Sequence, residues 1–259
     1  MKEIEKIADQ LYTAEINKTP IPPIRTAFEG EKDIKAAYKI QKLITLKKQD
    51  KGEKLIGKKI GLTSLAVQEQ LGVDEPDFGI LTSKMQIKNH GKLDSNQLMQ
   101  PKAETEWAFI LKTDLNDDEI TIEKVKDAID FAKVAIEIVG SRIENWNIKI
   151  TDTVADNASG SHFVLGSEKI SLTDIDLEHC QMQLFKNGEL VSEGSGKACM
   201  GNPLNAVLWL AKTMQKNGQP LKAGEIILSG ALGPMVNIAK GDKILTQIDG
   251  FEEVKFEII

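Results

Sequence analysis

Apolar residues recur at helical spacing in four stretches of the chain. Residues 2–17 and 32–50 place apolar side chains three or four positions apart, which is typical of amphipathic helices. The same spacing predicts helices over residues 121–133 and 203–217, the latter with proline near its start and glycine directly after its end. The segment TPIPPI between the first two helices carries three prolines and therefore indicates an extended connection.

The pattern of apolar and polar residues changes from Gly57 onward. Short apolar runs there alternate with Gly, Asp and Asn, which is typical of β-strands. In QMQLFK-NG-ELVSEG, Asn187-Gly188 separates two such runs and predicts a β-hairpin. The other predicted strands are LIGKKIGL, TEWAFILK, VAIEIVG, HFVLG, EIILSG, KILTQI and EVKFEI. We therefore expect an α+β protein with a helical part over residues 1–55 and a β-rich body over residues 56–259, together one functional unit.

Composition and charge narrow the class of protein. The chain is 41% hydrophobic and 28% charged, as in ordinary globular proteins. Its 33 basic and 39 acidic residues give a net charge of −6, and the lysines are scattered, so nucleic acid is not an expected partner. Cys180 and Cys199 indicate neither a disulfide framework nor a metal site. The N-terminus MKEIEKIADQL resembles neither a signal peptide nor a membrane span, so we expect a cytoplasmic protein without a membrane partner.

Two glutamates stand two positions apart in PKAETEWAFIL. If this segment is a strand, Glu104 and Glu106 share one face, where they are either solvated or in need of a cationic partner. Glu137, in VAIEIVG, lies between apolar β-formers and is expected near the core. Three carboxylates without His or Cys suit a hard cation, Mg²⁺ or Mn²⁺, rather than zinc. A solvated strand face is the alternative interpretation.

Three further polar segments each have an ordinary structural interpretation. Lys59 lies between glycines in GKKIGLTS, which lets the backbone approach a ligand, but a surface lysine on an edge strand explains the pattern equally. Asp77 in DEPDFG is typical of a turn. Asn157 and Ser159 lie in a polar loop over residues 151–166, where they suit turn caps. The nucleophile motif G-x-S-x-G is absent from the sequence.

These segments occur together and in order along the whole chain. GKKIGLTSLAVQEQLGVDEPDFGILT, PKAETEWAFIL, EIVGSRIENWNIKITDTVADNAS, LKAGEIILSGAL and KGD resemble the 2-hydroxypenta-2,4-dienoate (2-keto-4-pentenoate) hydratase family of the fumarylacetoacetate hydrolase superfamily, over residues 2–258. The resemblance implies a β-roll of mixed sheets with an N-terminal helical part and two packed helices. It also implies a homo-oligomer that works in aromatic meta-cleavage catabolism beside neighbouring pathway enzymes.

The resemblance assigns roles to residues of this chain. The implied ligands of a divalent metal, Mg²⁺ or Mn²⁺, are Glu104, Glu106 and Glu137. The implied acid–base residues are Lys59 and Asp77. The implied groups for the substrate carboxylate are Ser159 and the backbone at Gly61 and Leu62. The implied reaction is that of a hydro-lyase: a proton moves to C5 of 2-hydroxypenta-2,4-dienoate, and water then adds at C4 to give 4-hydroxy-2-oxopentanoate.

The chain departs from the family pattern in three places. After the third glutamate the family motif reads E-[IV]-[VI]-D-[ST]-R, whereas this chain has Gly140 in place of the aspartate. If that aspartate orients a ligand or a water, its loss weakens metal binding. Residues 160–162 are Gly-Ser-His, and Trp107 stands where the family has a smaller aliphatic residue.

Three alternative functions stay open at this point. A 4-oxalocrotonate decarboxylase, acting on 2-oxohex-3-enedioate, shares the fold, the metal site and the lysine, but its position equivalent to Asp77 is usually not a carboxylate and Phe78 is more often Tyr. A hydratase of seven-carbon dioic acids keeps the chemistry and changes the substrate, although SRIENWNIK resembles the pentadienoate group more closely. A catalytically impaired homologue is supported by Gly140 alone.

Overall fold

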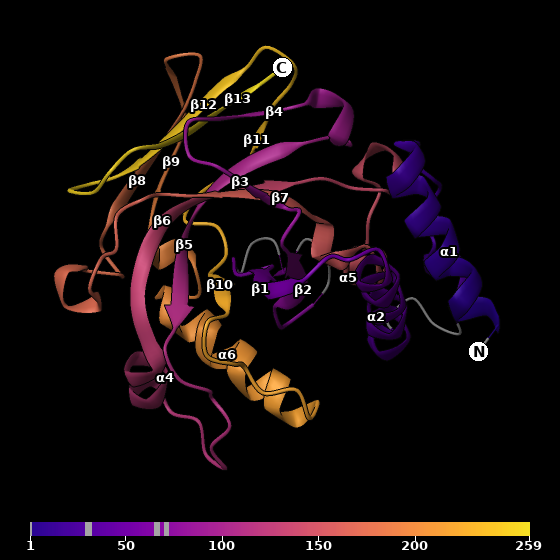
Figure 1. Ribbon diagram of the computed structural model, residues 1–259, viewed down its shortest axis with the longest axis horizontal. Coiled ribbons are helices and arrows are strands. Elements are labelled where there is room, and N and C mark those ends of the chain that lie inside the picture. Colours follow the sequence, from indigo (N-terminus) through magenta and orange to yellow (C-terminus); the bar gives the residue numbers. More distant parts are fainter. Residues whose placement is uncertain (1, 29–32, 65–67, 70–72) are drawn as a thin grey trace.

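The computed structural model describes residues 2–28, 33–64, 68–69 and 73–259 (Figure 1). Its helices are α1 (Lys2–Asn17), α2 (Ile34–Asp50), α4 (Ile122–Ala128), α5 (Ile150–Ala155) and α6 (Pro203–Lys216). The helices expected over residues 2–17 and 203–217 are confirmed, and so is the one expected over 32–50 from Ile34 onward, residue 32 lying outside the described residues. The first turns of two of them are capped as their sequences suggest, because Asp33 accepts from the amide of Ala36 and Asn202 from that of Leu204.

The strands form two mixed sheets. The larger sheet runs β2 (Asp77–Thr82), β1 (Leu55–Gly61), β10 (Ile226–Leu228), β5 (Lys102–Leu111), β6 (Ile129–Val139), β7 (Gly160–Leu165) and β3 (Gln86–Ile87), and β11 (Val236–Asn237) pairs with β5. The smaller sheet runs β4 (Gly91–Leu93), β13 (Val254–Ile258), β12 (Lys243–Ile248), β8 (Gln181–Lys186) and β9 (Glu189–Ser195). The predicted hairpin is confirmed, with Asn187 and Gly188 both at positive φ between β8 and β9.

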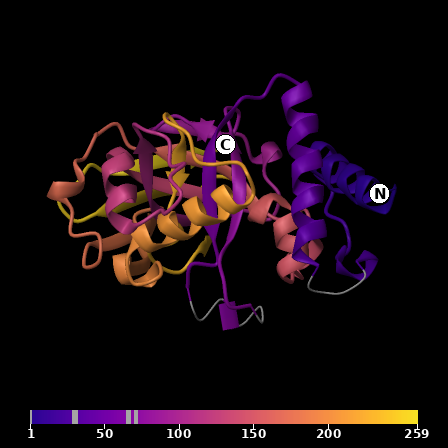
Figure 2. The ribbon, with the colours of Figure 1, turned by 90° about the horizontal axis from the view of Figure 1, so that it is seen from below.

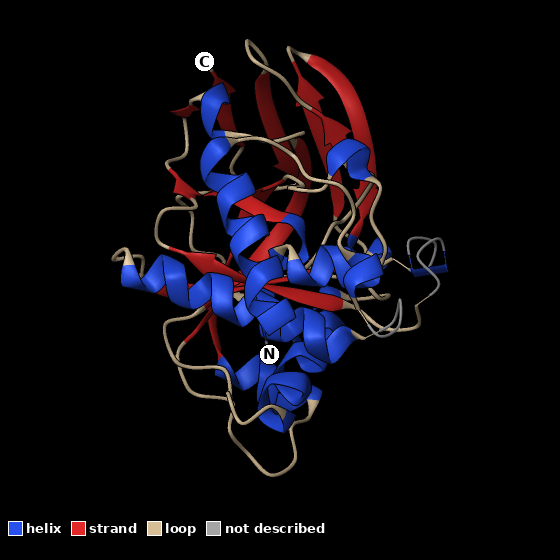
Figure 3. Ribbon diagram, turned by 90° about the vertical axis from the view of Figure 1, so that its right-hand side faces the viewer, coloured by secondary structure: helices blue, strands red, loops and turns tan. Residues whose placement is uncertain are grey.

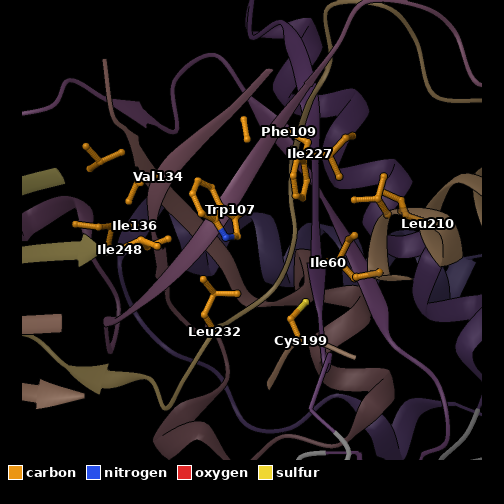
Figure 4. Packing of buried hydrophobic residues seen from close by; sticks show 14 of the residues in the cluster. Ile60, Trp107, Phe109, Val134, Ile136, Cys199, Leu210, Ile227, Leu232 and Ile248 are labelled. Carbon is orange, nitrogen blue, oxygen red and sulfur yellow. The ribbon is translucent and has the colours of Figure 1, made fainter. Parts of the chain in front are cut away.

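The main core lies between the two sheets. Trp107 is fully buried there among apolar side chains that include Val134, Ile136 and Ile248 (Figure 4). Its indole Nε1 donates to Cys180 Sγ at 3.4 Å, so the polar end of the ring has a partner. The large side chain at position 107 thus packs in the core between the sheets. It lies on the face of β5 opposite the one that carries Glu104 and Glu106.

A second apolar cluster joins the N-terminal helices to the body. Side chains of α1 and α2, among them Ile7, Leu11 and Ile40, pack with Ile150 and Val154 of α5. Figure 2 shows these helices gathered at one end of the molecule, and Figure 3 views the molecule from that end, with helices in front of the strands. The helical part and the body therefore share one core. No helix in the described ranges combines the length and the apolar character that a membrane crossing requires.

Two sequence predictions are wrong in part. The helix expected over residues 121–133 ends at Ala128, and β6 begins at Ile129, because residues 129–134 pair with β5 across the long β5–β6 ladder. The first residues of the polar loop expected over 151–166 form the buried helix α5. Asp152 of this helix connects it to a distant part of the chain, because its Oδ1 accepts hydrogen bonds from the amides of Ile24 and Arg25. These contacts stabilise the helix.

Candidate metal centre

Three glutamates from two adjacent strands converge in the interior. Glu104 of β5 lies directly opposite Glu137 of β6, and Glu106 follows two positions along β5 on the same face. One carboxylate oxygen from each lies within 4.8 Å of the others. Their exposed fractions are 8%, 0% and 1% for Glu104, Glu106 and Glu137. The alternative interpretation, in which Glu104 and Glu106 lie on a solvated strand face, is therefore wrong.

The cluster has too few hydrogen-bond donors for its oxygens. Glu106 Oε2 accepts from the amide of Gly230 at 2.9 Å, but Glu106 Oε1 and both oxygens of Glu137 have no hydrogen-bond partner in the described structure. The ammonium of Lys59 lies 3.4 Å from Glu137 Oε2 as an ion pair. Buried carboxylate oxygens without partners are costly, so the site is built for a group that supplies positive charge.

The pKa values of these carboxyls reflect the same shortage of hydrogen-bond donors and positive charge. Burial and the neighbouring Glu137 raise the pKa of Glu104 to about 7. Burial, Glu137 and Glu104 raise the pKa of Glu106 well above its usual value. Burial also raises the pKa of Glu137, although Lys59 acts in the opposite direction. A bound cation would reverse this cost, and a ligand set of oxygens alone fits a hard divalent ion.

Lys59 projects from β1 into the same region. Strand β1 lies between β2 and β10, and Lys59 is only 3% exposed, so a surface lysine on an edge strand is the wrong interpretation. Its Nζ donates to the carbonyl of Ala158 at 3.0 Å. Burial disfavours the charged amine, but Glu137, Asp77 and the other glutamates outweigh burial and raise the pKa of Lys59. The side chain is therefore an ammonium held in one place.

Asp77 begins β2 and faces Gly61 of β1 in the strand register, so the interpretation of this residue as a plain turn is wrong. Both carboxylate oxygens are buried and have no hydrogen-bond partner among the described residues. Burial raises the pKa of Asp77 to about 6 while Lys59 opposes the rise. A Cβ on Gly61 would lie 2.3 Å from Asp77 Oδ1 and 3.2 Å from Lys59 Nζ. Glycine at position 61 therefore leaves the space in which these two groups meet.

The carbonyl that binds Lys59 comes from an unusual turn. Asn157, Ala158 and Ser159 all have positive φ, at 57°, 49° and 55°, which costs non-glycine residues free energy. The side chain of Asn157 compensates by bonding the backbone of Ile80 twice, accepting from its N–H at 2.8 Å and donating to its carbonyl at 3.0 Å. Ser159 Oγ lies 3.2 Å from Thr153 Oγ1. The structure thus brings Ser159 and Lys59 together through one turn.

The turn is also held from behind by an ion pair. Arg142 binds Asp156 through its Nε and the Asp156 carbonyl through its Nη2, and its Nη1 donates to the carbonyl of Gly160 at 3.2 Å. The amide of Gly140 donates to the carbonyl of Ser159 at 2.8 Å. A Cβ at position 140 would lie 2.7 Å from the Met99 carbonyl, so this backbone suits glycine. Gly140 therefore supports the turn through its backbone.

One residue of the site was missed by sequence reasoning. Gly230, two residues after the end of β10, donates its amide to Glu106, and it has a φ of +101°. A Cβ at this position would lie 2.4 Å from Thr63 Oγ1. Both constraints require glycine. The clue in the sequence is the glycine that closes EIILSG, a position that also fits an ordinary turn.

Replacing Gly230 by alanine is expected to weaken binding of Mn²⁺ by about 10- to 100-fold, the range for lost supporting contacts around a metal. The added methyl pushes against Thr63 and moves the amide away from Glu106. Isothermal titration with Mn²⁺ measures the change. Gly241→Ala is the matched control, because Gly241 has a φ of +91° but open space around a Cβ. Equal affinity in the two variants would remove the amide of Gly230 from the site.

Comparison with known proteins places this arrangement in context. The family model described as fumarylacetoacetate (FAA) hydrolase C-terminal matches residues 75–259. The 2-keto-4-pentenoate hydratase of Paraburkholderia xenovorans (strain LB400) is 48% identical over 253 residues, covering 98% of this chain and 94% of that protein. The 2-hydroxyhexa-2,4-dienoate hydratase of Comamonas testosteroni is 43% identical over 249 residues, covering 95% and 94%.

A solved structure matches over the full length. The 4-oxalocrotonate decarboxylase from Pseudomonas putida G7, complexed with magnesium and adipate, superposes with a TM-score of 0.95 at 32% identity and covers 100% of this chain and 98% of its own. The mixed sheets and the N-terminal helices of the present fold are thus those of a known enzyme structure.

Proposed function

This chain belongs to the fumarylacetoacetate hydrolase family, and we propose that it is a divalent-cation-dependent hydro-lyase that adds water to 2-hydroxypenta-2,4-dienoate to give 4-hydroxy-2-oxopentanoate. The main support is the buried cluster of Glu104, Glu106 and Glu137 with Lys59 and Asp77 beside it. The hydratase relatives support the choice of substrate. The setting would be aromatic meta-cleavage catabolism.

The three glutamates are the proposed ligands of Mg²⁺ or Mn²⁺. Oxygens of Glu106 and Glu137 that lack hydrogen-bond partners among the described residues support this assignment. When bound, such an ion would supply Lewis-acid chemistry to the oxygen at C2 of the substrate. The amide of Gly230 keeps Glu106 oriented toward the cluster.

Lys59 and Asp77 differ in their freedom to move protons. Lys59 Nζ already has two partners, the Ala158 carbonyl and Glu137, so its proposed role is that of a fixed donor to substrate oxygen. Asp77 has no hydrogen-bond partner on either oxygen in the part of the chain that the structure describes, and it is the proposed proton shuttle. It delivers to C5 the proton that leaves the C2 hydroxyl. Water then adds across C3 and C4, with its oxygen on C4 and a proton on C3.

The substrate carboxylate is proposed to bind at the turn beside Lys59. The groups that suit an anion are the hydroxyl of Ser159 and the amides of Gly61 and Leu62. Support for this placement comes from the Ala158–Lys59 bond, which holds the turn that carries Ser159 beside the lysine, and from the close approach of the Gly61 backbone to Asp77 and Lys59. The apolar cluster that α1 and α2 share with α5 supports the further proposal that residues 1–55 and 56–259 act as one unit. The further proposal of a homo-oligomer rests on the family resemblance alone.

Two assays on the same preparation test the proposed reaction. Purified protein with Mg²⁺ or Mn²⁺ receives 2-hydroxypenta-2,4-dienoate, and the loss of dienol absorbance is followed. Separately it receives 2-oxohex-3-enedioate, and CO₂ is measured. Loss of the dienol without CO₂ release is the expected result. Release of CO₂ without consumption of the dienol would identify a decarboxylase, and inactivity in both assays with metal bound would identify an impaired homologue.

A further inference from the structure

A small cavity of about 100 Å³ opens beside Asp77. Its apolar side chains come from three separate parts of the chain: Ile34 and Tyr38 of α2, Val73, and Ile150 and Val154 of α5. Asp77 also lines it and is the residue that links it to the carboxylate cluster. The exposed residues Asp74 and Glu75 line it too.

The walls of this cavity are held firmly in place. The ring of Tyr38 stacks on Phe78 with centroids 4.4 Å apart and planes 16° apart, and its hydroxyl accepts from the Phe78 amide at 3.2 Å. Gln41 of α2 donates to the carbonyls of both Phe78 and Val154, at 2.9 Å each. These bonds connect α2, β2 and α5. The cavity therefore has a fixed shape, which a specificity pocket requires.

We propose that this cavity receives the end of the substrate beyond C4 and selects a short, uncharged tail. The inference rests on the proposed function, in which the carboxylate binds at the turn beside Lys59, the C2 oxygen lies at the glutamates, and Asp77 delivers its proton to C5. Because Asp77 also lines the cavity, atoms from C5 onward lie beside it. The apolar side chains of the cavity favour a vinyl or alkyl end over a polar one.

Charge excludes a second carboxylate from the same place. Among the described residues that line the cavity, Asp74, Glu75 and Asp77 are acidic and none is Lys, Arg or His. A tail carboxylate would lose water and meet like charge, which is how a pocket rejects a competing substrate. The cavity therefore favours five- and six-carbon monoacids over the dioic acids used by the alternative functions.

The helical part of the chain supplies one side of the cavity. Ile34 and Tyr38 of α2 lie outside residues 75–259, the region that the family model matches, whereas Ile150 and Val154 lie inside it. The N-terminal helices and the body therefore form the cavity together.

Binding of saturated 2-oxo acids tests the cavity without turnover. Wild-type protein with Mg²⁺ is titrated calorimetrically with 2-oxopentanoate, 2-oxohexanoate and 2-oxohexanedioate. We expect the two monoacids to bind within about 10-fold of each other and the dioic acid at least about 100-fold more weakly, in line with the discrimination that pockets achieve. Turnover of the matching dienoates should follow the same order.

Variants of the lining residues should change the preference for tail length and the preference for tail charge separately. Val154→Ala enlarges the cavity and should raise the ratio of 2-oxohexanoate to 2-oxopentanoate affinity by about 10-fold, the effect of one methylene. The half-buried Ile34→Ala is a second enlarging variant that disturbs the core less. Glu75→Lys should improve binding of the dioic acid by about 10-fold. Val125→Ala, a fully buried valine on α4, is the control for general loss of packing.

The outcomes separate this inference from the proposed function. If the protein turns over 2-hydroxypenta-2,4-dienoate but no wall variant changes the affinity ratios among the 2-oxo acids, the tail-binding role of the cavity is wrong. The proposed hydratase function then stands. Tight binding of 2-oxohexanedioate by the wild type would overturn the tail-binding role as well. Absence of turnover, with the expected affinity order for the 2-oxo acids, would instead overturn the hydratase and retain the cavity as a tail-binding site.

Discussion

Replacing Glu106 by glutamine is expected to abolish cation binding and hydration together while the fold stays intact. Glu106 is fully buried, and one of its oxygens has no hydrogen-bond partner in the described chain. Glutamine keeps the shape and an oxygen for the Gly230 amide, but it removes the negative charge that a hard cation requires. Metal affinity should fall by more than the about 10- to 100-fold typical of lost supporting contacts.

Thermal unfolding distinguishes this effect from misfolding. In wild-type protein, metal at 100 times its dissociation constant adds about 2.7 kcal/mol to the free energy of unfolding. The Glu106→Gln chain should unfold near the wild-type temperature without metal and gain nothing when metal is added. Glu189→Gln, at an exposed position of the β8–β9 hairpin, should behave as wild type. Retention of both metal-induced stabilisation and activity would refute the ligand assignment.

The strand that bears this glutamate was predictable from local pattern alone. Alternation of side chains along a strand placed Glu104 and Glu106 on one face, and β5 has that form. The hairpin at Asn187-Gly188 was predictable for a similar reason, because its turn conformation depends on residues next to each other in sequence. Burial of the glutamates was not predictable in this way, since it depends on what covers the face of the sheet.

Elements that depend on distant partners were harder to predict. Residues 129–133 have helical spacing, but pairing with β5 makes them strand. Helix α5 is short, and it is stabilised by contacts of Asp152 with Ile24 and Arg25, more than a hundred positions away. Local propensity is weak compared with such contacts, so the tertiary structure decided both segments.

The active-site partners illustrate the same limit. Lys59 and Asp77 each had an ordinary interpretation, and only the β1–β2 register brings them to the two sides of Gly61. Before that register was known, their pairing rested on family resemblance. The supporting contacts of Gly140 and Gly230 follow from steric fit with Met99 and Thr63, which no single segment of the sequence reveals.

Replacing Lys59 by methionine is expected to stop turnover and leave cation binding in place. Methionine has a similar length but cannot donate a proton or a hydrogen bond, and loss of a positioned acid–base group costs about 10²- to 10⁴-fold in rate. Loss of the ammonium also leaves the carboxylates of Glu137 and Asp77 without their nearby positive charge, so cation affinity should hold or increase. Steady-state hydration and calorimetric titration with Mn²⁺ give the two readouts.

The neighbouring lysine provides a closely matched control for this experiment. Lys58 is also buried, at 7% exposed, but it points to the opposite face of β1 and pairs with Glu225 at 2.6 Å. Lys58→Met should lower stability through loss of that pair and retain turnover, because its side chain does not reach the glutamate cluster. If Lys59→Met retains near-normal turnover, the lysine is structural, and its bond to Ala158 serves only to hold the turn. If both variants lose cation binding, the strand itself has shifted, and neither lysine has a separate catalytic role.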